Sequence, residues 1–357
     1  MKILILGGTG AMGVHLVELL SKNESYDIFV TSRSDKKSKE TNINFCKGNA
    51  RDIEFIRSLL QEKWDVIVDF MLYSTDMFEQ RVDLFLNASN QYLYVSSARV
   101  YANNEGLINE QSLRLLDSIT DQKYLSTDEY ALSKARQENL LFKNILKNWT
   151  IIRPYITYNS DRLQLGVFEK EDWLYRSMKG RTIVFSEDIF KKFSTLTHGL
   201  DVAKGIASLI GDPSAHGEAF HITSNESKTW GEILNIYLDV LENKLGFRPK
   251  FMLQNMEEFL SHNHAKHQII YDRIYDRMFN NNKISKYIEV NDFYSIKNGI
   301  ENCIDLFLIS PNFKRIDWVK EAIKDRSTKE HASISEMSNT KDKIRYFVYR
   351  YLIKKKL

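Results

Sequence analysis

The sequence predicts an α/β fold, with a doubly wound parallel sheet followed by a smaller, mixed, mostly helical C-terminal lobe. Short apolar segments alternate with segments of helical periodicity over roughly the first 158 residues. The apolar segments are hydrophobic throughout, which is typical of parallel strands covered on both faces. The alternation stops after Pro154, and a chain of 357 residues exceeds what one compact core normally holds.

Each expected element is supported by its own pattern. The expected strands are short apolar runs, at residues 2–6, 27–32, 43–49, 65–70, 91–97, 149–154 and 217–223. The expected helices repeat apolar residues at spacings of three and four, at residues 14–22, 52–62, 75–89, 128–147 and 198–212. Asp52 is the expected N-cap of its helix, because an aspartate side chain accepts hydrogen bonds from free backbone amides.

The change of pattern predicts the domain boundaries. Residues 1–158 form the first domain, to which residues 193–225 return; residues 159–192 and 226–330 form the second lobe. Residues 331–357 are expected to be a polar linker and a basic amphipathic tail.

Composition narrows the class of protein. Hydrophobic residues make up 43% and charged residues 27%, as in ordinary soluble globular proteins. The two cysteines lie far apart without metal-type spacing, which favours a reducing, cytoplasmic location. The first apolar run is too short for a signal peptide, and no run approaches the roughly 18 residues of a membrane span.

Charge is concentrated in the tail. Residues 341–357 contain seven Lys or Arg and one Asp, so they carry +6, and the other 340 residues sum to −3. We therefore expect no nucleic-acid partner. The tail also repeats apolar residues at helical spacing, from Ile344 to Leu352. Two interpretations stay open: contact with an anionic membrane surface, or docking on the protein itself or on a partner subunit.

A glycine motif, GGTGAMG, separates the first expected strand from the first expected helix. Glycines at this turn let the chain bend sharply and let a pyrophosphate approach the backbone at a helix N-terminus. The motif predicts a Rossmann-type dinucleotide site. The residues of the motif expected to contact the cofactor are Gly7, Thr9, Gly10, Ala11, Met12 and Gly13.

Further candidates follow the other strands. In a parallel sheet, ligands bind at the carboxyl ends of the strands, which share one edge. The third, fourth and fifth strands are followed by the candidate cofactor residues Asn49, Ala50, Phe70, Met71, Leu72 and Ser96, and Ser97 comes next.

Tyr130 and Lys134 are four residues apart on an expected helix, so they share one helical face. A tyrosine with a pKa of about 10 is a poor base near neutral pH, and an adjacent cation favours the phenolate. The pair is therefore a candidate for acid–base catalysis, although this spacing alone is common on surface helices.

In combination, these motifs resemble the extended short-chain dehydrogenase/reductase superfamily, the NAD-dependent epimerase/dehydratase family that modifies nucleotide sugars. The resemblance covers about residues 1–225 and includes, in order, GGTGAMG, GNARD, SSARVY and YALSK. IIRPYITY, HGLDVAKGI and GEAFHITS also fit.

The resemblance implies a role for each matching residue. Tyr130 corresponds to the catalytic tyrosine, Lys134 to its lysine partner, and Ser97 to the residue that holds the substrate oxygen. Lys134 should also bind the nicotinamide ribose. Arg153, Pro154 and Tyr155 correspond to the strand end beside the nicotinamide. The implied function is an oxidoreductase acting on a nucleotide-activated sugar, of the keto-sugar reductase or epimerase type, and the expected assembly is a homodimer.

The sequence departs from the family pattern at two places. Gly48-Asn49 stands where relatives often carry Gly-Asp, and the bulkier DFMLYS follows the fourth strand. Tyr73 therefore either shapes the substrate pocket or packs in the core. Arg162 and Arg176 are candidates to contact a substrate diphosphate, as is Arg181. His262, His264 and His267 lack a carboxylate or cysteine at ligand spacing, so we expect no metal.

The end of the second strand bears on the choice of cofactor. An acidic residue there would bind both ribose hydroxyls and select NAD, but the chain has VTSRSDKK. Ser32, Arg33 and Ser34 favour NADP, because a guanidinium can pair with a 2′-phosphate. NAD remains the alternative.

A second class of function also stays open. Some relatives of this fold have lost the tyrosine or lysine, and act as dinucleotide-binding regulators or RNA-associated proteins. The presence of Ser97, Tyr130 and Lys134 together favours an enzyme.

Overall fold

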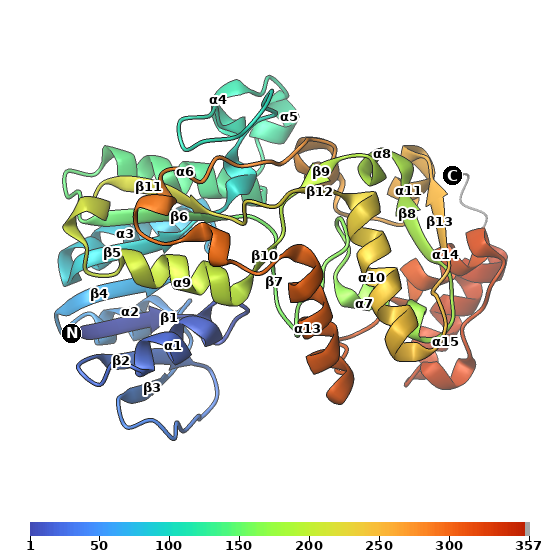
Figure 1. Ribbon diagram of the computed structural model, residues 1–357, viewed down its shortest axis with the longest axis horizontal. Coiled ribbons are helices and arrows are strands. Elements are labelled where there is room, and N and C mark those ends of the chain that lie inside the picture. The colour runs from blue at the N-terminus through green and yellow to red at the C-terminus, as the bar shows by residue number, and fades with distance from the viewer. Residues whose placement is uncertain (354–357) are drawn as a thin grey trace. The chain divides into compact units, whose positions relative to one another are not determined.

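The computed structural model describes residues 1–353, which divide into two compact units. The first unit contains Met1–Tyr158, Thr195–Glu226 and Met278–Ser295. The second contains Asn159–Ser194, Ser227–Arg277 and the described chain from Ile296 onward. Figure 1 shows the elements of each unit.

The first unit is built on a seven-stranded parallel sheet in the order β11-β6-β5-β4-β1-β2-β3. This order, with the first strand between the second and the fourth, confirms the Rossmann-type fold. The strands are β1 (Lys2–Leu6), β2 (Asp27–Ser32), β3 (Ile43–Lys47), β4 (Trp64–Asp69), β5 (Ser89–Val95), β6 (Trp149–Pro154) and β11 (Glu218–Ile222).

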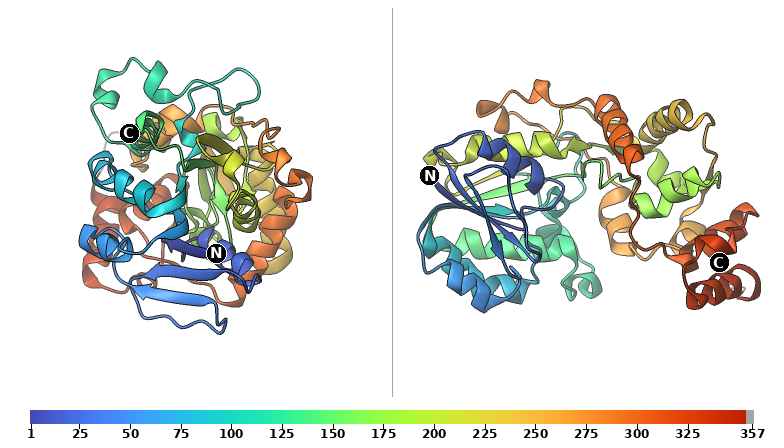
Figure 2. Two further views of the ribbon diagram at one scale, coloured as in Figure 1. Left: turned by 90° about the vertical axis from the view of Figure 1, so that its left-hand side faces the viewer. Right: turned by 90° about the horizontal axis from the view of Figure 1, so that it is seen from below.

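Alternate side chains of each strand enter two separate cores. Ile3 and Ile5 of β1 point to one face, where they meet Leu16 and Ile206. Leu4 and its neighbour Leu6 point to the opposite face. Because both faces are covered, the strands can be apolar throughout, as their sequences are. Figure 2 shows the sheet with helices on both sides.

The helices of the first unit match the expected periodic segments. α1 (Gly13–Ser21) and α9 (Gly199–Leu209) cover one face; α2 (Ile53–Leu59), α3 (Thr75–Ala88) and α6 (Tyr130–Lys143) cover the other. The side chain of Asp52 accepts a hydrogen bond from the Glu54 amide, which confirms the expected N-cap. α6 is shorter than the expected helix at both ends, because Glu129 caps its start and Asn144 is extended.

Smaller elements complete the first unit. Three short helices lie between β5 and α6: η1 (Ala98–Val100), α4 (Leu115–Ser118) and α5 (Gln122–Leu125). The others are β7 (Thr157–Tyr158), β10 (Thr197–His198), η2 (Pro213–Ala215), η4 (Ile284–Lys286) and η5 (Val290–Asp292).

Met278–Ser295 belongs to the first unit, although the sequence placed this segment in the second lobe. Ile284, Val290 and Phe293 are buried in the same core as α9, and this burial holds the segment there.

The second unit is mostly helical. Its longer helices are α7 (Lys170–Met178), α10 (Trp230–Leu245), α13 (Ile296–Ile309), α14 (Trp318–Thr328) and α15 (Thr340–Phe347). Its strands form two short pairs, β8 (Ile183–Ser186) with β13 (Phe251–Gln254), and β9 (Phe193–Ser194) with β12 (Lys228–Thr229). The remaining elements are α8 (Glu187–Phe190), α11 (Met256–Ser261), α12 (Lys266–Gln268), η3 (Ile269–Arg273), η6 (Ile334–Glu336) and η7 (Val348–Leu352).

A buried ion cluster joins α7 to α14. Arg176, which is fully buried, donates to Glu321 at 2.7 Å and to Asp325 at 3.1 Å. Arg181 donates to the same aspartate at 3.1 Å and to Glu336 at 2.9 Å. The segment expected to be a linker thus contributes Glu336 to a folded structure. Along residues 1–353, no helix is long and apolar enough to cross a membrane.

Candidate active site

The glycine motif forms the turn between β1 and α1. Gly7 has a φ of +73°, a conformation that L side chains rarely adopt, and its amide donates to Thr31 Oγ1 at 3.0 Å. A Cβ on Gly13 would lie 2.6 Å from the Cα of Gly8, so this glycine permits close packing within the turn. A Cβ on Gly10 would meet only one backbone oxygen, at 3.9 Å. The surface at Gly10 is therefore open to a ligand.

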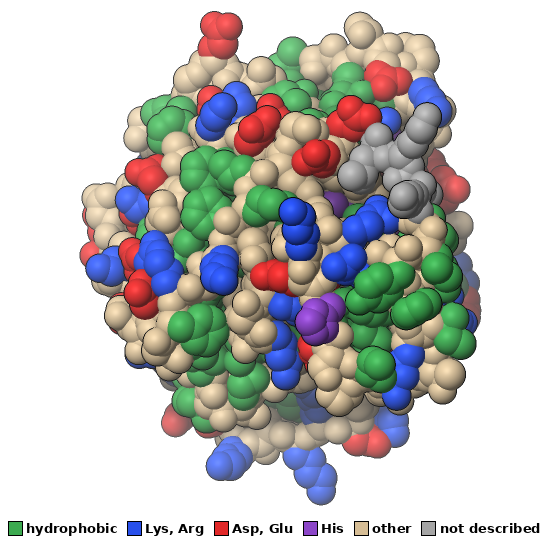
Figure 3. Space-filling view, turned by 90° about the vertical axis from the view of Figure 1, so that its right-hand side faces the viewer, with side chains coloured by type: hydrophobic (Ala, Val, Ile, Leu, Met, Phe, Trp, Pro, Cys, Tyr) green, Lys and Arg blue, Asp and Glu red, His purple; other side chains and the backbone are tan. Residues whose placement is uncertain are grey.

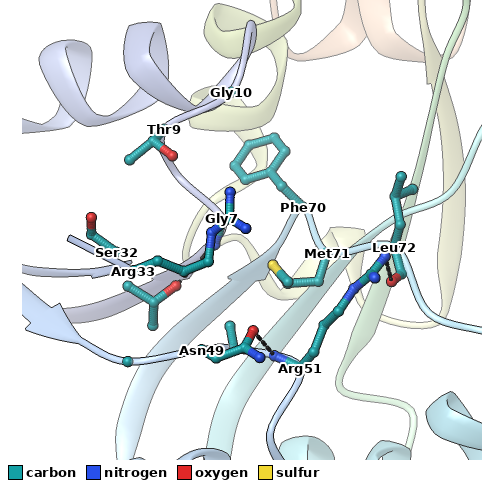
Figure 4. A pocket seen from close by; sticks show the side chains of 13 residues that line it. Gly7, Thr9, Gly10, Ser32, Arg33, Asn49, Arg51, Phe70, Met71 and Leu72 are labelled. Carbon is teal, nitrogen blue, oxygen red and sulfur yellow. Dashed lines mark hydrogen bonds between the residues drawn. The ribbon is translucent and has the colours of Figure 1, made fainter. Parts of the chain in front are cut away.

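A cleft of about 490 Å³ lies at the carboxyl ends of β1 to β4. This is the edge at which parallel sheets bind ligands. Its lining residues are Gly7, Thr9, Gly10, Thr31, Ser32, Arg33, Gly48, Asn49, Ala50, Arg51, Phe70, Met71 and Leu72. Figure 4 shows these side chains.

Ten of the lining residues were expected from the sequence as cofactor residues, and three were not: Thr31, Gly48 and Arg51. Arg51 donates to the Leu72 carbonyl at 3.1 Å, which brings a cation across the mouth of the cleft. Its place in the GNARD motif, directly after the expected residues Asn49 and Ala50, was the available signal.

Arg33 is the exposed residue at the end of β2. Its side chain extends across the cleft toward Gly7 (Figure 4). Among residues 1–353, no carboxylate forms an ion pair with it. Serines flank Arg33 on both sides. Ser32 is buried, and its hydroxyl donates a hydrogen bond to the Ser34 carbonyl at 2.9 Å. Arg33 is therefore the side chain of this group that is free to bind an anion.

The catalytic candidates come from β5 and α6. Ser97 follows the end of β5, and its Oγ accepts a hydrogen bond from the Arg99 amide at 3.2 Å. Tyr130 is the first residue of α6 and is partly exposed. The Arg99 guanidinium lies 5.2 Å from the centre of the Tyr130 ring. Lys134 lies one helical turn further along α6.

Lys134 is buried below the catalytic tyrosine candidate. Its Nζ donates to the Val95 carbonyl at 2.8 Å and lies 4.5 Å from the centre of the Tyr94 ring. Burial lowers the pKa of Lys134 to about 8, while Asp69 and Glu138 act in the opposite direction. The ammonium form therefore still predominates near pH 7.

Glu129 fixes the start of α6, a role that the sequence reasoning missed. Its carboxylate accepts hydrogen bonds from the Ala131 amide at 2.8 Å and from the Tyr124 hydroxyl at 2.8 Å. It also pairs with Arg99 at 2.7 Å. These contacts hold both neighbours of the Tyr130 ring, the helix terminus and the guanidinium, in place.

A buried polar network lies beneath the site. Asp69, at the end of β4, accepts from the Met71 amide and the Tyr92 hydroxyl, both at 2.8 Å. Burial raises the pKa of Asp69 to about 6. Tyr73 is also buried, packed on Phe78 at 6.1 Å between ring centres. The sequence left two positions open for Tyr73, the substrate pocket or the core, and the structure places its side chain in the core.

Two expected cofactor side chains point elsewhere. Ser96 Oγ donates to Glu138 at 2.7 Å, and Arg153 forms two hydrogen bonds of 2.8 Å with the same carboxylate. Arg153 also donates to the Tyr101 hydroxyl at 3.0 Å. Because both side chains are satisfied in this buried network, they are not available to a cofactor.

The remaining expected residues lie outside the cleft lining. Ala11, Met12 and Gly13 lie in the turn and at the start of α1, while Ser34 follows β2. Pro154 ends β6, and the next residue, Tyr155, is buried against Phe279 at 5.4 Å between ring centres.

The two candidate diphosphate ligands differ in availability. Arg162 is about half exposed and pairs with Glu169 at 3.1 Å. Arg176 is fully buried in the ion cluster described above, so the expectation that it meets a diphosphate is wrong: carboxylates of the same unit already occupy its donors.

Residues 3–155 match the model of the NAD dependent epimerase/dehydratase family. The match covers 153 of the 357 residues of the chain. It contains the glycine motif, the cleft residues and the Ser97, Tyr130 and Lys134 group.

Two curated relatives have contrasting names. A chloroplast stem-loop binding protein of 41 kDa from Arabidopsis thaliana is 24% identical over 293 residues, which cover 74% of this chain and 73% of that protein. A dTDP-D-glucose 4,6-dehydratase from Dictyostelium discoideum is 28% identical over 172 residues, 39% of each chain.

Solved structures share the fold of the chain. UDP-glucuronic acid 4-epimerase from Bacillus cereus, in complex with NAD, has a TM-score of 0.64 and 16% identity, over 89% of this chain and all of that one. dTDP-glucose 4,6-dehydratase from Bacillus anthracis, also with NAD, has a TM-score of 0.66 and 18% identity, over 87% and 97% of the two chains.

The residues present fit a dinucleotide. The open surface at Gly10 admits a phosphate close to the backbone, and the exposed guanidinium of Arg33 supplies positive charge within the same cleft. The side chains of Asn49 and Met71 line the same cleft.

Proposed function

We propose that the protein is an NADP-dependent oxidoreductase acting on a nucleotide-activated sugar, as a keto-sugar reductase or an epimerase. The observation that carries the proposal is the position of Tyr130 and Lys134 on α6, beside the carboxyl end of β5, which Ser97 follows. These residues belong to the same unit as the dinucleotide cleft.

In this proposal Tyr130 exchanges a proton with the sugar oxygen at which oxidation or reduction occurs. Its partly exposed position at the start of α6 leaves the ring accessible. Two cations, Arg99 and Lys134, stabilise negative charge developing there. The bound nicotinamide supplies hydride chemistry at its C4 atom.

Ser97 orients the sugar oxygen. Its Oγ already accepts from the Arg99 amide, and no acceptor for its hydroxyl hydrogen is present among residues 1–353. The hydroxyl can therefore donate to the substrate without breaking a bond within the protein.

The choice of NADP rests on Arg33. No acidic side chain lines the β2 end of the cleft, so nothing there would repel a 2′-phosphate. A guanidinium pairs well with a phosphate, and this one extends into the cleft. The solved relatives named above were crystallised with NAD, which supports a nicotinamide dinucleotide and leaves NAD as the alternative.

A panel of UDP-, dTDP-, GDP- and CDP-sugars, including 4-keto forms, tests the proposal with each cofactor. A reductase oxidises reduced cofactor in proportion to the sugar converted, whereas an epimerase converts sugar without net cofactor change. Detection of either activity supports the proposal. Absence of cofactor binding, and of turnover with every sugar, would contradict it.

The second candidate function is RNA binding, favoured by the Arabidopsis stem-loop binding relative. Residues 1–340 carry a net charge of −3, which opposes this candidate. A stem-loop RNA titration at physiological salt distinguishes the two functions. Tight, salt-sensitive RNA binding without sugar turnover would favour the second candidate.

A further inference from the structure

The C-terminal helix presents an exposed apolar face. α15 continues without interruption into the π-helical turn η7, so residues 340–352 form one helical segment. Ile344 is 59% exposed, Phe347 54%, Tyr351 54% and Leu352 65%. We call these four residues the apolar face. Ile344, Phe347 and Tyr351 are spaced by three and four residues, which places them on one side of the helix, and Leu352 adjoins Tyr351.

The opposite side anchors the helix to the second unit. The Tyr346 hydroxyl donates to Asp325 at 2.6 Å and accepts from the Ala332 amide at 2.7 Å. Arg350 Nε donates to the Glu330 carbonyl at 3.0 Å. The helix is thus held in place by its inner side, and the apolar face points away from the contacts that fix it.

Basic residues border the apolar face on both sides. With about 100° of rotation per residue along α15, Arg345 and Lys341 fall on one flank, and Lys343 falls on the other. Figure 3 views this side of the molecule and shows hydrophobic side chains gathered beside Lys and Arg side chains on the right-hand part of the face. Lys354, Lys355 and Lys356 follow in the sequence, outside the described residues.

The acidic residues that the helix contacts lie on its inner side. Asp342 is 5% exposed and pairs with Arg315 at 3.3 Å. Asp325 is fully buried in the ion cluster. The outer surface of the helix therefore combines exposed apolar side chains with positive charge that no carboxylate of residues 340–352 neutralises.

We propose that this surface binds an anionic phospholipid membrane. An apolar face bordered by cations on both flanks is the arrangement of helices that lie in a membrane interface: apolar side chains enter the acyl boundary and Lys or Arg meet lipid phosphates. A second copy of the chain would bring the same positive flanks together, and like charges oppose that contact. The inference goes beyond the proposed chemistry, since it concerns where the enzyme acts.

Vesicle co-sedimentation of the full chain tests this proposal. We expect binding to vesicles that contain phosphatidylglycerol, weak binding to phosphatidylcholine alone, and release at high salt. Lys341→Gln, Lys343→Gln and Arg345→Gln combined should weaken binding to the anionic vesicles roughly a hundredfold, at about fivefold for each cation removed. Phe347→Ser with Leu352→Ser should lower it with the charge unchanged.

Both variants leave the anchoring Tyr346 intact, and unaltered thermal unfolding verifies the fold. Leu306→Ser with Ile309→Ser on α13 is the matched control, since these residues are 51% and 80% exposed and should not affect vesicle binding. Failure of the parent chain to bind anionic vesicles would overturn the proposal. So would an apolar-face variant that keeps vesicle binding but loses oligomerisation, which would assign the face to a second copy.

Discussion

At the scale of single residues, Arg33 determines the expected choice of cofactor. Its guanidinium extends into the cleft and pairs with no carboxylate of residues 1–353. Arg33→Ala should weaken NADP binding by about 1.5–3 kcal/mol, the loss of a charge-assisted hydrogen bond, and leave NAD binding nearly unchanged. Titration of both cofactors against both proteins measures the difference. Equal losses for the two cofactors, or a parent protein that prefers NAD, would assign Arg33 another role.

The raised pKa of Asp69 predicts that the stability of the protein depends on pH. Burial raises its pKa in the folded protein to about 6, above the ordinary value of 3.8. Protonation therefore favours the folded state: this stabilisation is complete below about pH 4 and is lost as pH rises through about 6. Asp69→Asn removes the titration and keeps an oxygen acceptor for the Met71 amide.

The stability difference is the free energy of unfolding of the parent minus that of the Asp69→Asn variant. This difference should decrease by up to about 3 kcal/mol as the pH rises from 4 to 7. Denaturant titrations of both proteins across this range provide the values. A difference that stays constant, or rises with pH, would show that Asp69 is ionised throughout.

The role of a residue could be predicted where its position follows from the order of the strands. It could not be predicted where its position depends on a partner far away in the sequence. The cleft residues follow strand ends, so the order of strands predicts that Asn49, Met71 and Gly7 lie at one edge of the sheet, where they line one cleft. Arg176 and Arg162 look equivalent in sequence. Arg176 forms a buried ion pair with Glu321, which lies 145 residues away in the sequence, and no local pattern indicates that pairing.

At the scale of elements, two glycines of the turn between β1 and α1 have different roles: Gly13 permits close packing, and Gly10 leaves room for a ligand. Gly13→Ala should destabilise the protein by about 1–3 kcal/mol, because its Cβ would lie 2.6 Å from the Cα of Gly8. Gly10→Ala should leave stability almost unchanged and weaken dinucleotide binding, since its Cβ meets one backbone oxygen, at 3.9 Å, and faces the cleft. Thermal unfolding and cofactor titration of both variants distinguish the effects. Equal destabilisation by the two would refute this division.

The strands and longer helices of the first unit were predictable because each is long enough to show its period. The shorter elements were not. α4 and α5 have four residues each, too few for a helical repeat to be visible. Residues 278–295 were placed in the wrong unit because Ile284 and Phe293 are buried by contacts with α9, far away in the sequence.

At the scale of the whole molecule, we expect the buried ion cluster to stabilise the second unit. Arg176→Met removes one of the buried cations that pair with Glu321 and Asp325, and should cost up to about 3–5 kcal/mol. Arg162→Met is the matched control, because its pair with Glu169 is about half exposed and should contribute about 0–1 kcal/mol. Denaturant unfolding followed by tryptophan fluorescence compares the two. A similar small effect for both would contradict the assigned role of the cluster.

The central claim for the whole protein is that Tyr130 transfers the proton while hydride moves. Tyr130→Phe removes only the hydroxyl, so turnover of the active sugar nucleotide should fall by at least about a hundredfold. Cofactor affinity should remain close to that of the parent, because the cleft residues are untouched. Tyr26→Phe, a partly buried tyrosine beside the core of the first unit, should leave both quantities unchanged. Single-turnover kinetics with cofactor titration of the Tyr130→Phe protein is the most direct measurement. Slow chemistry with intact cofactor binding is the predicted result, and near-normal chemistry would contradict the account.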